Sequence, residues 1–94
     1  MFSVTRDPSG TIKLSGRLDA SSAPEAAKEF AKISGSATLD FSELAYISSA
    51  GLGVLFAAQK RLKTAGHGLK LVNLNTHIRD VFALARFDLV FEIE

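Results

Sequence analysis

The segment from Leu39 to Phe56, LDFSELAYISSAGLGVLF, constrains the fold most strongly, because its pattern changes from one element to another within a few residues. A brief apolar run over residues 37–40 predicts a strand, and apolar residues at helical spacing begin at Ala50. A polar turn that ends in Ser48 and Ser49 is expected between them. Such a junction is typical of sheets whose strands alternate with helices.

Four further strands are predicted along the chain. Alternating or short runs of apolar residues place them over residues 2–5, 12–18, 69–72 and 89–93. Between the first two, the run Asp7-Pro8-Ser9-Gly10 has the residue order of a type I turn. The chain is therefore expected to open with a hairpin.

Three helices are predicted from apolar spacing and end signals. The first is expected to begin with a Ser-x-x-Glu capping box at Ser22 and to end at the glycine at position 35. The second follows the serine pair and ends at Gly66, and the third is capped by Asn73 or Asn75. On the second helix the predicted apolar face holds Leu52, Leu55, Phe56 and Leu62.

The order of these elements is β-β-α-β-α-β-α-β, which predicts the α/β class with most of the later strands parallel to one another. A chain of 94 residues that is 47% hydrophobic is expected to form one domain, residues 1–94, with its own core. In open α/β sheets, sites form beyond the carboxyl ends of strands. We therefore expect an interaction surface at residues 19–22 and 40–49, where Asp19 and Asp40 are interpreted as solvated carboxylates.

Composition argues against several classes of protein. The net charge is +1 without a long charged block, which does not favour nucleic acid or an acidic membrane surface. No apolar run approaches the ~20 residues of a membrane span, and cysteine is absent. His67 and His77 lack nearby ligand partners, so neither a metal nor a cofactor is expected. We expect a cytoplasmic chain that does not insert into membranes.

The serine pair does not match known catalytic or nucleotide-binding motifs. The run Ser48-Ser49-Ala50-Gly51 lacks the first glycine of the G-x-S-x-G elbow of hydrolases. The run Gly51-Leu52-Gly53 has no third glycine and no following Lys-Ser or Lys-Thr pair, so the dinucleotide and P-loop patterns fail. These glycines are interpreted as small residues that let the helix pack closely or let a partner approach.

A serine at a helix start has two possible roles. Ser49, or Ser48 with the register moved by one, can accept a hydrogen bond from an unpaired amide of the first turn. The same amides and the positive end of the helix dipole also favour an anion, including a phosphate carried by the serine itself. Capping alone is the commoner role of such serines.

Two motifs resemble the STAS domain family, the anti-sigma-factor antagonists. One is Leu39-Asp40-Phe41-Ser42 followed by Tyr46-Ile47-Ser48-Ser49-Ala50-Gly51-Leu52-Gly53-Val54-Leu55, and the other is Leu14-Ser15-Gly16-Arg17-Leu18-Asp19. The resemblance spans essentially the whole chain. It implies a small mixed sheet of four to five strands with helices packed mainly on one face.

The resemblance also implies a function. In antagonists of this family, a serine at the start of the second helix is phosphorylated by a kinase-type anti-sigma factor, and a serine phosphatase resets it. The unphosphorylated form binds that factor and releases the sigma factor. The implied phosphorylation site is Ser49, and Ser48, which replaces an aspartate common in the family, is a second candidate. The implied partner-binding residues are Asp19, Ala20, Ser21, Asp40, Ser42, Ser48, Ser49, Ala50, Gly51 and Leu52, and none is expected to be catalytic.

An alternative function within the same family remains open. The chain would then be an accessory subunit that docks permanently on the ATPase of a membrane lipid transporter. The complete Ser49 motif and Asp19 favour the switch, whereas Ser48 in place of aspartate is compatible with the docking subunit. The sequence does not fix the oligomeric state, because a free edge strand over residues 2–5 favours pairing with a second copy while Arg6 and Asp7 oppose it.

Overall fold

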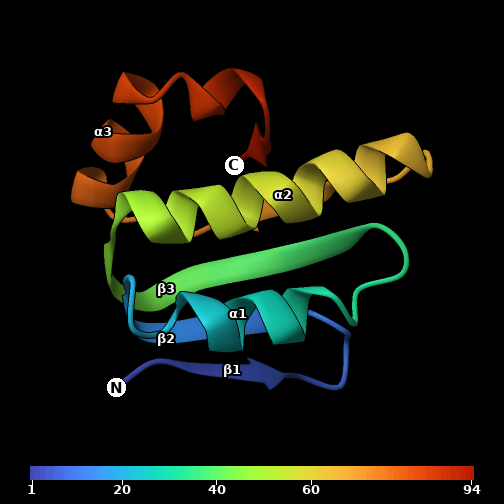
Figure 1. Ribbon diagram of the computed structural model, residues 1–94, viewed down its shortest axis with the longest axis horizontal. Coiled ribbons are helices and arrows are strands. Elements are labelled where there is room, and N and C mark those ends of the chain that lie inside the picture. Colours follow the sequence, from blue (N-terminus) through green and yellow to red (C-terminus); the bar gives the residue numbers. More distant parts are fainter.

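A computed structural model describes residues 1–94 as one five-stranded sheet with three α-helices and a short 3-10 helix (Figure 1). The strands are β1 (Ser3–Arg6), β2 (Ile12–Leu18), β3 (Ala37–Ile47), β4 (Leu69–Val72) and β5 (Glu92–Ile93). The helices are α1 (Ala23–Phe30), α2 (Ser49–Thr64), α3 (Thr76–Leu84) and the 3-10 helix η1 (Phe87–Leu89). The predicted class and order of elements are confirmed.

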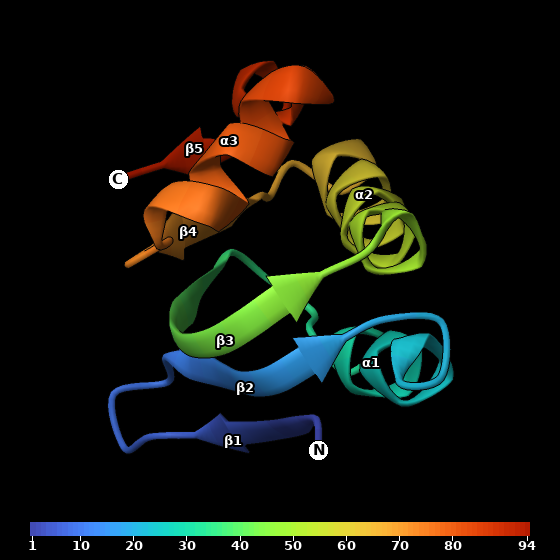
Figure 2. The same cartoon turned by 90° about the vertical axis from the view of Figure 1, so that its left-hand side faces the viewer.

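The strands lie in the order β1-β2-β3-β4-β5. Only β1 is antiparallel to its neighbour, and each of the other neighbouring pairs is parallel. Parallel neighbours need a crossover connection, which α1, α2 and α3 supply. Viewed from the end, α1 and α2 lie side by side on one face of the sheet (Figure 2). The predicted mixed sheet with helices mainly on one face is confirmed.

The core lies between the sheet and its helices. Its fully buried side chains include Leu14, Leu39, Phe41 and Leu71 from the strands and Phe30, Leu55 and Phe82 from the helices. Phe82 of α3 packs edge-on against Phe41 of β3, with 6.0 Å between the ring centroids, so α3 covers the same face as α1 and α2. The carboxyl ends of β2 and β3 therefore lead directly into α1 and α2 at one edge of the sheet.

Strand β3 is much longer than predicted. It runs on to Ile47, so the polar turn expected over residues 40–49 is wrong. The pairing of β3 with β2 shifts register twice, and each shift adds a residue to β3. The buried residues Phe41, Leu44 and Ile47 consequently fall three apart instead of two. Because its buried residues do not alternate strictly with exposed ones, the sequence pattern does not predict the full length of this strand.

Several predicted helix and strand ends also change. Helix α1 ends at Phe30 rather than at the glycine at position 35, and the last strand shortens to Glu92–Ile93 because η1 precedes it. Phe56 was expected on the apolar face of α2, but it is 41% exposed and stacks on Phe87 instead. At the other helices, α2 is followed by Gly66 and α3 is capped by Asn75, as predicted.

Candidate functional site

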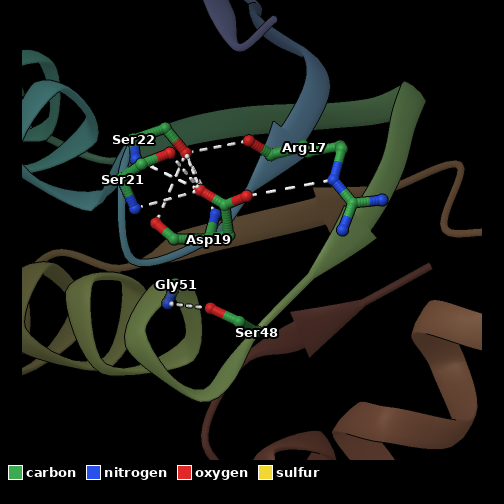
Figure 3. Close-up of polar contacts among 6 residues, drawn as sticks. All are labelled: Arg17, Asp19, Ser21, Ser22, Ser48 and Gly51. Atoms are coloured by element: carbon green, nitrogen blue, oxygen red, sulfur yellow. Dashed lines mark hydrogen bonds and ion pairs between the residues drawn. The ribbon is translucent and has the colours of Figure 1, made fainter.

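Two strand-to-helix junctions meet at the carboxyl edge of the sheet. The backbone N–H of Ser48 donates a hydrogen bond of 2.9 Å to the carbonyl oxygen of Leu18, which joins the end of β3 to the end of β2. The loop of residues 19–22 therefore lies beside the start of α2, as Figure 3 shows. These two junctions form the site.

Ser48 and Ser49 have different environments at the β3–α2 junction. Ser48 is the N-cap residue, with an extended backbone, and its half-buried Oγ accepts a 3.4 Å hydrogen bond from the N–H of Gly51 (Figure 3). Ser49 is the first residue of α2, is exposed, and takes part in no side-chain hydrogen bond. Of the two registers predicted for the cap, the structure selects Ser48, and it leaves the hydroxyl of Ser49 free.

Gly51 fixes the start of α2 against both strands. A Cβ atom at this position would lie 2.7 Å from Leu18 Cγ, 2.8 Å from the Leu18 carbonyl oxygen and 2.9 Å from Ile47 Cγ1. Only glycine permits that approach. A Cβ at Gly53, in contrast, would meet no atom within 4 Å. Close packing therefore explains why residue 51 is glycine. At Gly53 there is open space above the helix backbone.

The β2–α1 junction is closed by its own hydrogen bonds. Asp19 Oδ1 accepts hydrogen bonds from the N–H of Ser21 at 3.1 Å and from its hydroxyl at 2.7 Å. Ser22 Oγ donates to the carbonyl oxygen of Arg17 at 2.8 Å and accepts from the N–H of Asp19 at 3.0 Å, and it accepts from no amide of α1. The predicted capping box at Ser22 is therefore wrong, because the Asp19 amide takes the place of the helix amide that a cap would bind.

The carboxylate of Asp19 is held in its ionised form. The hydrogen bond from the Ser21 hydroxyl, aided by the amides of Ser22 and Ser21, lowers the pKa of Asp19 below its usual value. Arg17 Nε lies 3.8 Å from the second carboxylate oxygen, and the guanidinium of Arg17 stacks 4.3 Å from the ring centroid of Tyr46. The loop next to the start of α2 thus holds an ionised carboxylate that is paired with Arg17.

The start of α2 carries no compensating negative charge of its own. Its first turn holds no acidic residue, so the unpaired amides and the positive end of the helix dipole are left unneutralised. Negative charge is favoured at this end of a helix, and the exposed first residue of α2, Ser49, lies there.

The structure brings together most of the residues implied as partner contacts, but not all. Asp19, Ala20 and Ser21 lie near the residues from Ser48 to Leu52. Gly51 and Leu52 are buried, so they support the surface rather than form it. This part of the implied surface consists of one exposed loop and the first turn of α2.

Asp40 and Ser42 lie elsewhere, on strand β3. An extended strand rises about 3.3 Å per residue, which places Ser42 about 20 Å before Ser48 along the chain. Asp40 Oδ1 accepts from the Ser42 N–H at 2.8 Å and from Asn73 Nδ2 at 3.1 Å. Burial raises the pKa of Asp40, but these hydrogen bonds outweigh it and the net pKa is lowered. Of the two loops expected to form the surface, 19–22 and 40–49, the second is wrong for residues 40–47, which belong to strand β3, and only Ser48 and Ser49 lie at the junction.

Arg17 belongs to the site although the sequence did not single it out, whereas Ser22 lies in the 19–22 loop that was expected there but was predicted to act as a helix cap. Arg17 lies in the Leu14–Asp19 motif, directly before the last strand residue, and that position next to Asp19 was the available signal. Ser22 gave a misleading signal, because a serine followed three residues later by glutamate normally indicates a capping box. The roles of both side chains depend on contacts in the folded chain that the local sequence does not show.

No group of three or more His, Asp or Glu side chains is positioned to hold a metal ion. None of the helices is long and apolar enough to cross a membrane.

Comparisons with known proteins place the chain in a family. The family described as "Mlab, STAS domain" matches residues 2–92. BtrV of Bordetella bronchiseptica, whose name describes it as a candidate anti-sigma factor antagonist, is 40% identical over 55 residues. That match covers 58% of this chain and 47% of BtrV, so it spans about half the length of the relative.

Solved structures show the same fold. An anti-sigma factor antagonist from Mycobacterium paratuberculosis is similar with a TM-score of 0.81 at 21% identity, covering 99% of this chain and 83% of that one. Unphosphorylated SpoIIAA, an anti-sigma factor antagonist, matches with a TM-score of 0.69 at 18% identity, covering 88% and 82%. The phosphorylated form of SpoIIAA from Bacillus matches with a TM-score of 0.72 at 16% identity, covering 100% and 91%.

The chain belongs to the STAS domain family, as the two sequence motifs indicated. Its relatives of known description are anti-sigma factor antagonists, which are regulatory binding proteins.

Proposed function

We propose that this protein is an anti-sigma factor antagonist whose binding is switched by phosphorylation of Ser49. In this proposal the unphosphorylated chain acts in the cytoplasm, binds a kinase-type anti-sigma factor and so releases a sigma factor. A serine phosphatase restores the binding form. The observation that carries the proposal is the exposed, unbonded hydroxyl of Ser49 at the first position of α2.

Ser49 is a better phosphate acceptor than Ser48 on geometric grounds. The oxygen of Ser48 is half-buried and already accepts from the Gly51 amide, so a kinase would have to break the cap to reach it. The oxygen of Ser49 needs no such rearrangement. We therefore assign the modification to Ser49 and the structural role to Ser48.

The physical basis of the switch is local charge. A phosphoserine carries about −1.5 to −2 charges at neutral pH. The helix amides stabilise that charge in the free protein, whereas a partner fitted to a small neutral hydroxyl would meet both bulk and charge. Asp19 adds a second negative group beside it. A change of about 1.4 kcal/mol alters affinity tenfold, so a penalty of about 3–4 kcal/mol would suffice for control.

The contact surface in this proposal is the exposed part of the two junctions. It comprises the loop residues Asp19, Ala20 and Ser21 together with Ser49 and Ala50. A partner that covers this surface would bury the Ser49 hydroxyl at its centre. Asp40 and Ser42 are too far along β3 to belong to the same patch.

Incubation with ATP and an extract of the source organism tests the proposal. Intact mass should show the gain of one phosphate, and fragmentation should place it on Ser49. The Ser49→Ala variant should gain none, while the matched Ser48→Ala variant should still be modified. In binding assays with the modifying kinase, Ser49→Ala should bind constitutively and Ser49→Asp weakly. A phosphate found on Ser48 alone would contradict the assignment.

A docking subunit for the ATPase of a membrane lipid transporter is the second candidate. It is favoured by a shallow apolar groove of about 430 Å³ between α1 and α2, which adjoins the site through Ala50 and Gly53. A permanent interface would need such a surface and no modification. Persistent absence of phosphate, together with co-purification of a transporter ATPase, would establish this candidate in place of the switch.

A further inference from the structure

A polar hollow lies at the opposite end of the molecule from Ser49. It has a volume of about 670 Å³ and is formed by the β1–β2 turn, the start of β3, the last turns of α2 and strands β4 and β5. Ser49 and Lys63 are fourteen positions apart on α2, which corresponds to about 21 Å at 1.5 Å per residue. In Figure 1 the first and last turns of α2 lie on opposite sides of the molecule, and β3 starts on the side of the last turn. The hollow therefore cannot be part of the proposed switch.

The size of the hollow suits a small organic molecule, and its lining selects a polar one. Pockets for such ligands typically measure about 300–1,000 Å³ and are mainly apolar. Here only two of the 14 lining residues, Ala37 and Leu69, are hydrophobic. An apolar ligand would gain little from this surface, whereas a ligand rich in hydroxyl or charged groups would replace water with equivalent hydrogen bonds.

Lys63 is the one lysine of the hollow without an ion-pair partner. The one carboxylate of the hollow, Glu92, lies 4.0 Å from the ammonium of Lys70, which also lies 2.7 Å from Glu94. Lys63 is exposed and takes part in no ion pair, and its ammonium lies beside Gly68, where an added Cβ would be 3.5 Å from Nζ. A lysine left in this way at the wall of a hollow favours an anionic ligand.

Two hydroxyl groups, those of Ser36 and Thr38, also line the hollow and can donate hydrogen bonds to a ligand. Ser36 Oγ accepts from the N–H of Gly68 at 3.3 Å, which leaves its own proton available. Thr38 also lines the hollow, and its hydroxyl makes no hydrogen bond to the protein. Lys63 and the Ser36 hydroxyl both lie beside Gly68, and Thr38 adds a further hydroxyl to the lining, so the hollow offers a cation and two hydroxyl donors to a ligand that carries an anionic group and hydroxyls.

The base of the hollow is rigid. Gln59 is the only polar side chain in the buried set, with 3% of its surface exposed. Its Nε2 donates to the carbonyl oxygen of Val90 at 2.8 Å, and its Oε1 accepts from the N–H of Leu69 at 2.8 Å. These bonds hold the end of α2 against β4 and the C-terminal segment, so the lining residues are already in place before any ligand arrives.

We propose that this hollow is a second binding site, which takes a phosphorylated sugar or a similar hydroxyl-rich phosphomonoester. The phosphate would pair with Lys63, and the ligand hydroxyls would bond with Ser36 and Thr38. This site does not depend on the modification of Ser49, and either proposal can fail without the other.

Backbone amide NMR of the full chain during titration with glucose 6-phosphate tests this proposal. Saturable shifts are expected at Gly66, Gly68 and neighbouring amides, with none at Ser49. Lys63→Gln should weaken binding at least tenfold, while Lys60→Gln, which removes the same charge one turn earlier outside the hollow, should leave it unchanged. Unsaturable shifts, or equal losses in both variants, would show nonspecific attraction of an anion and overturn the proposal.

Two further ligands separate the contributions of charge and hydroxyl groups. Glucose, which lacks the phosphate, should bind at least tenfold more weakly than glucose 6-phosphate. Inorganic phosphate should also bind more weakly, and Thr38→Val should reduce only the affinity for the sugar phosphate. Equal affinity for inorganic phosphate and the sugar phosphate would refute a sugar-sized ligand. Thermal unfolding of each variant shows whether a loss of binding reflects a loss of fold.

Discussion

The two strand-to-helix junctions use the same residue types but leave their hydroxyl groups in opposite states. After β2, the hydroxyls of Ser21 and Ser22 both donate to nearby oxygens, of Asp19 and Arg17 respectively. After β3, Ser48 caps α2 while the hydroxyl of Ser49 bonds to nothing. The first junction satisfies its own polar groups, whereas the second keeps one reactive group free at the surface.

This difference shows that two junctions at the same end of a sheet can serve different roles, one as a fixed surface and the other as a site of variable charge. A loop closed by internal hydrogen bonds presents a fixed shape to a partner, and its ionised carboxylate contributes a constant charge. A helix start held by a cap and by a close glycine contact can accept a variable charge without moving. The following predictions test this division, beginning with the largest expected effect on stability.

Gly51→Ala should destabilise the fold most. The added Cβ would lie within 3 Å of Leu18 and Ile47, including a backbone oxygen that cannot rotate away. Overpacking of this kind costs about 2–3 kcal/mol of unfolding free energy, measured by chemical denaturation. Gly53→Ala is the control, because its Cβ meets open space and should stabilise the helix by about 0.5–1 kcal/mol. Equal effects at both glycines would refute the close contact.

Ser48→Ala should have the next largest effect. Removing the cap leaves the Gly51 amide without its side-chain acceptor and should lower the free energy of unfolding by about 1 kcal/mol. The neighbouring Ser49→Ala change removes no hydrogen bond and should stay within about 0.5 kcal/mol of wild type. If the two changes exchanged these outcomes, the roles of the serines would be reversed.

Asp19→Asn should reduce stability in a pH-dependent way. Folding lowers the pKa of Asp19, so the ionised carboxylate stabilises the fold. This contribution is complete at pH values above the pKa of Asp19 in the unfolded chain, and it disappears as the pH falls through the lower pKa of Asp19 in the folded chain. The difference in thermal midpoint between wild type and variant should therefore be present at neutral pH and shrink progressively as pH falls below about 3.9, the ordinary pKa of aspartate. Asp80→Asn, an exposed aspartate outside any ion pair, should leave no such difference. A difference that persists at low pH would contradict the role of the charge.

Ser49→Asp should have a small effect, and in the stabilising direction. A single negative charge at the first turn of α2 interacts favourably with the helix dipole, by about 0.3–1 kcal/mol. Chemical denaturation should show a variant as stable as wild type or slightly more so, and high salt should remove the difference. Marked destabilisation by aspartate at this position would mean that the junction does not tolerate charge.

The sequence predicts those elements of the fold whose periodicity is simple. Strand β4 follows a short apolar run and helix α2 a helical pattern followed by Gly66, and both lie where these patterns place them. Strand β3 does not, because two extra residues relative to β2 break its alternation. Its true end at Ile47 depends on pairing with a neighbour, which local sequence does not encode.

The candidate site is predictable to the same extent. The serine pair at a helix start is visible in the sequence, but the choice between Ser48 and Ser49 as the cap depends on where β3 ends. The placement of Asp40 and Ser42 in a loop follows from the same missed strand. The bond from Ser22 to Arg17 joins a loop to a strand end, so it becomes visible only in three dimensions.

The most direct measurement is the thermal unfolding midpoint of the chain that carries phosphoserine at position 49. The account predicts a midpoint within about 4 °C of the unmodified chain, since a change of 1 kcal/mol shifts a domain of this size by about 4–8 °C. A fall of more than about 8 °C would show that the phosphate disrupts the start of α2, and it would contradict a switch built on an exposed hydroxyl.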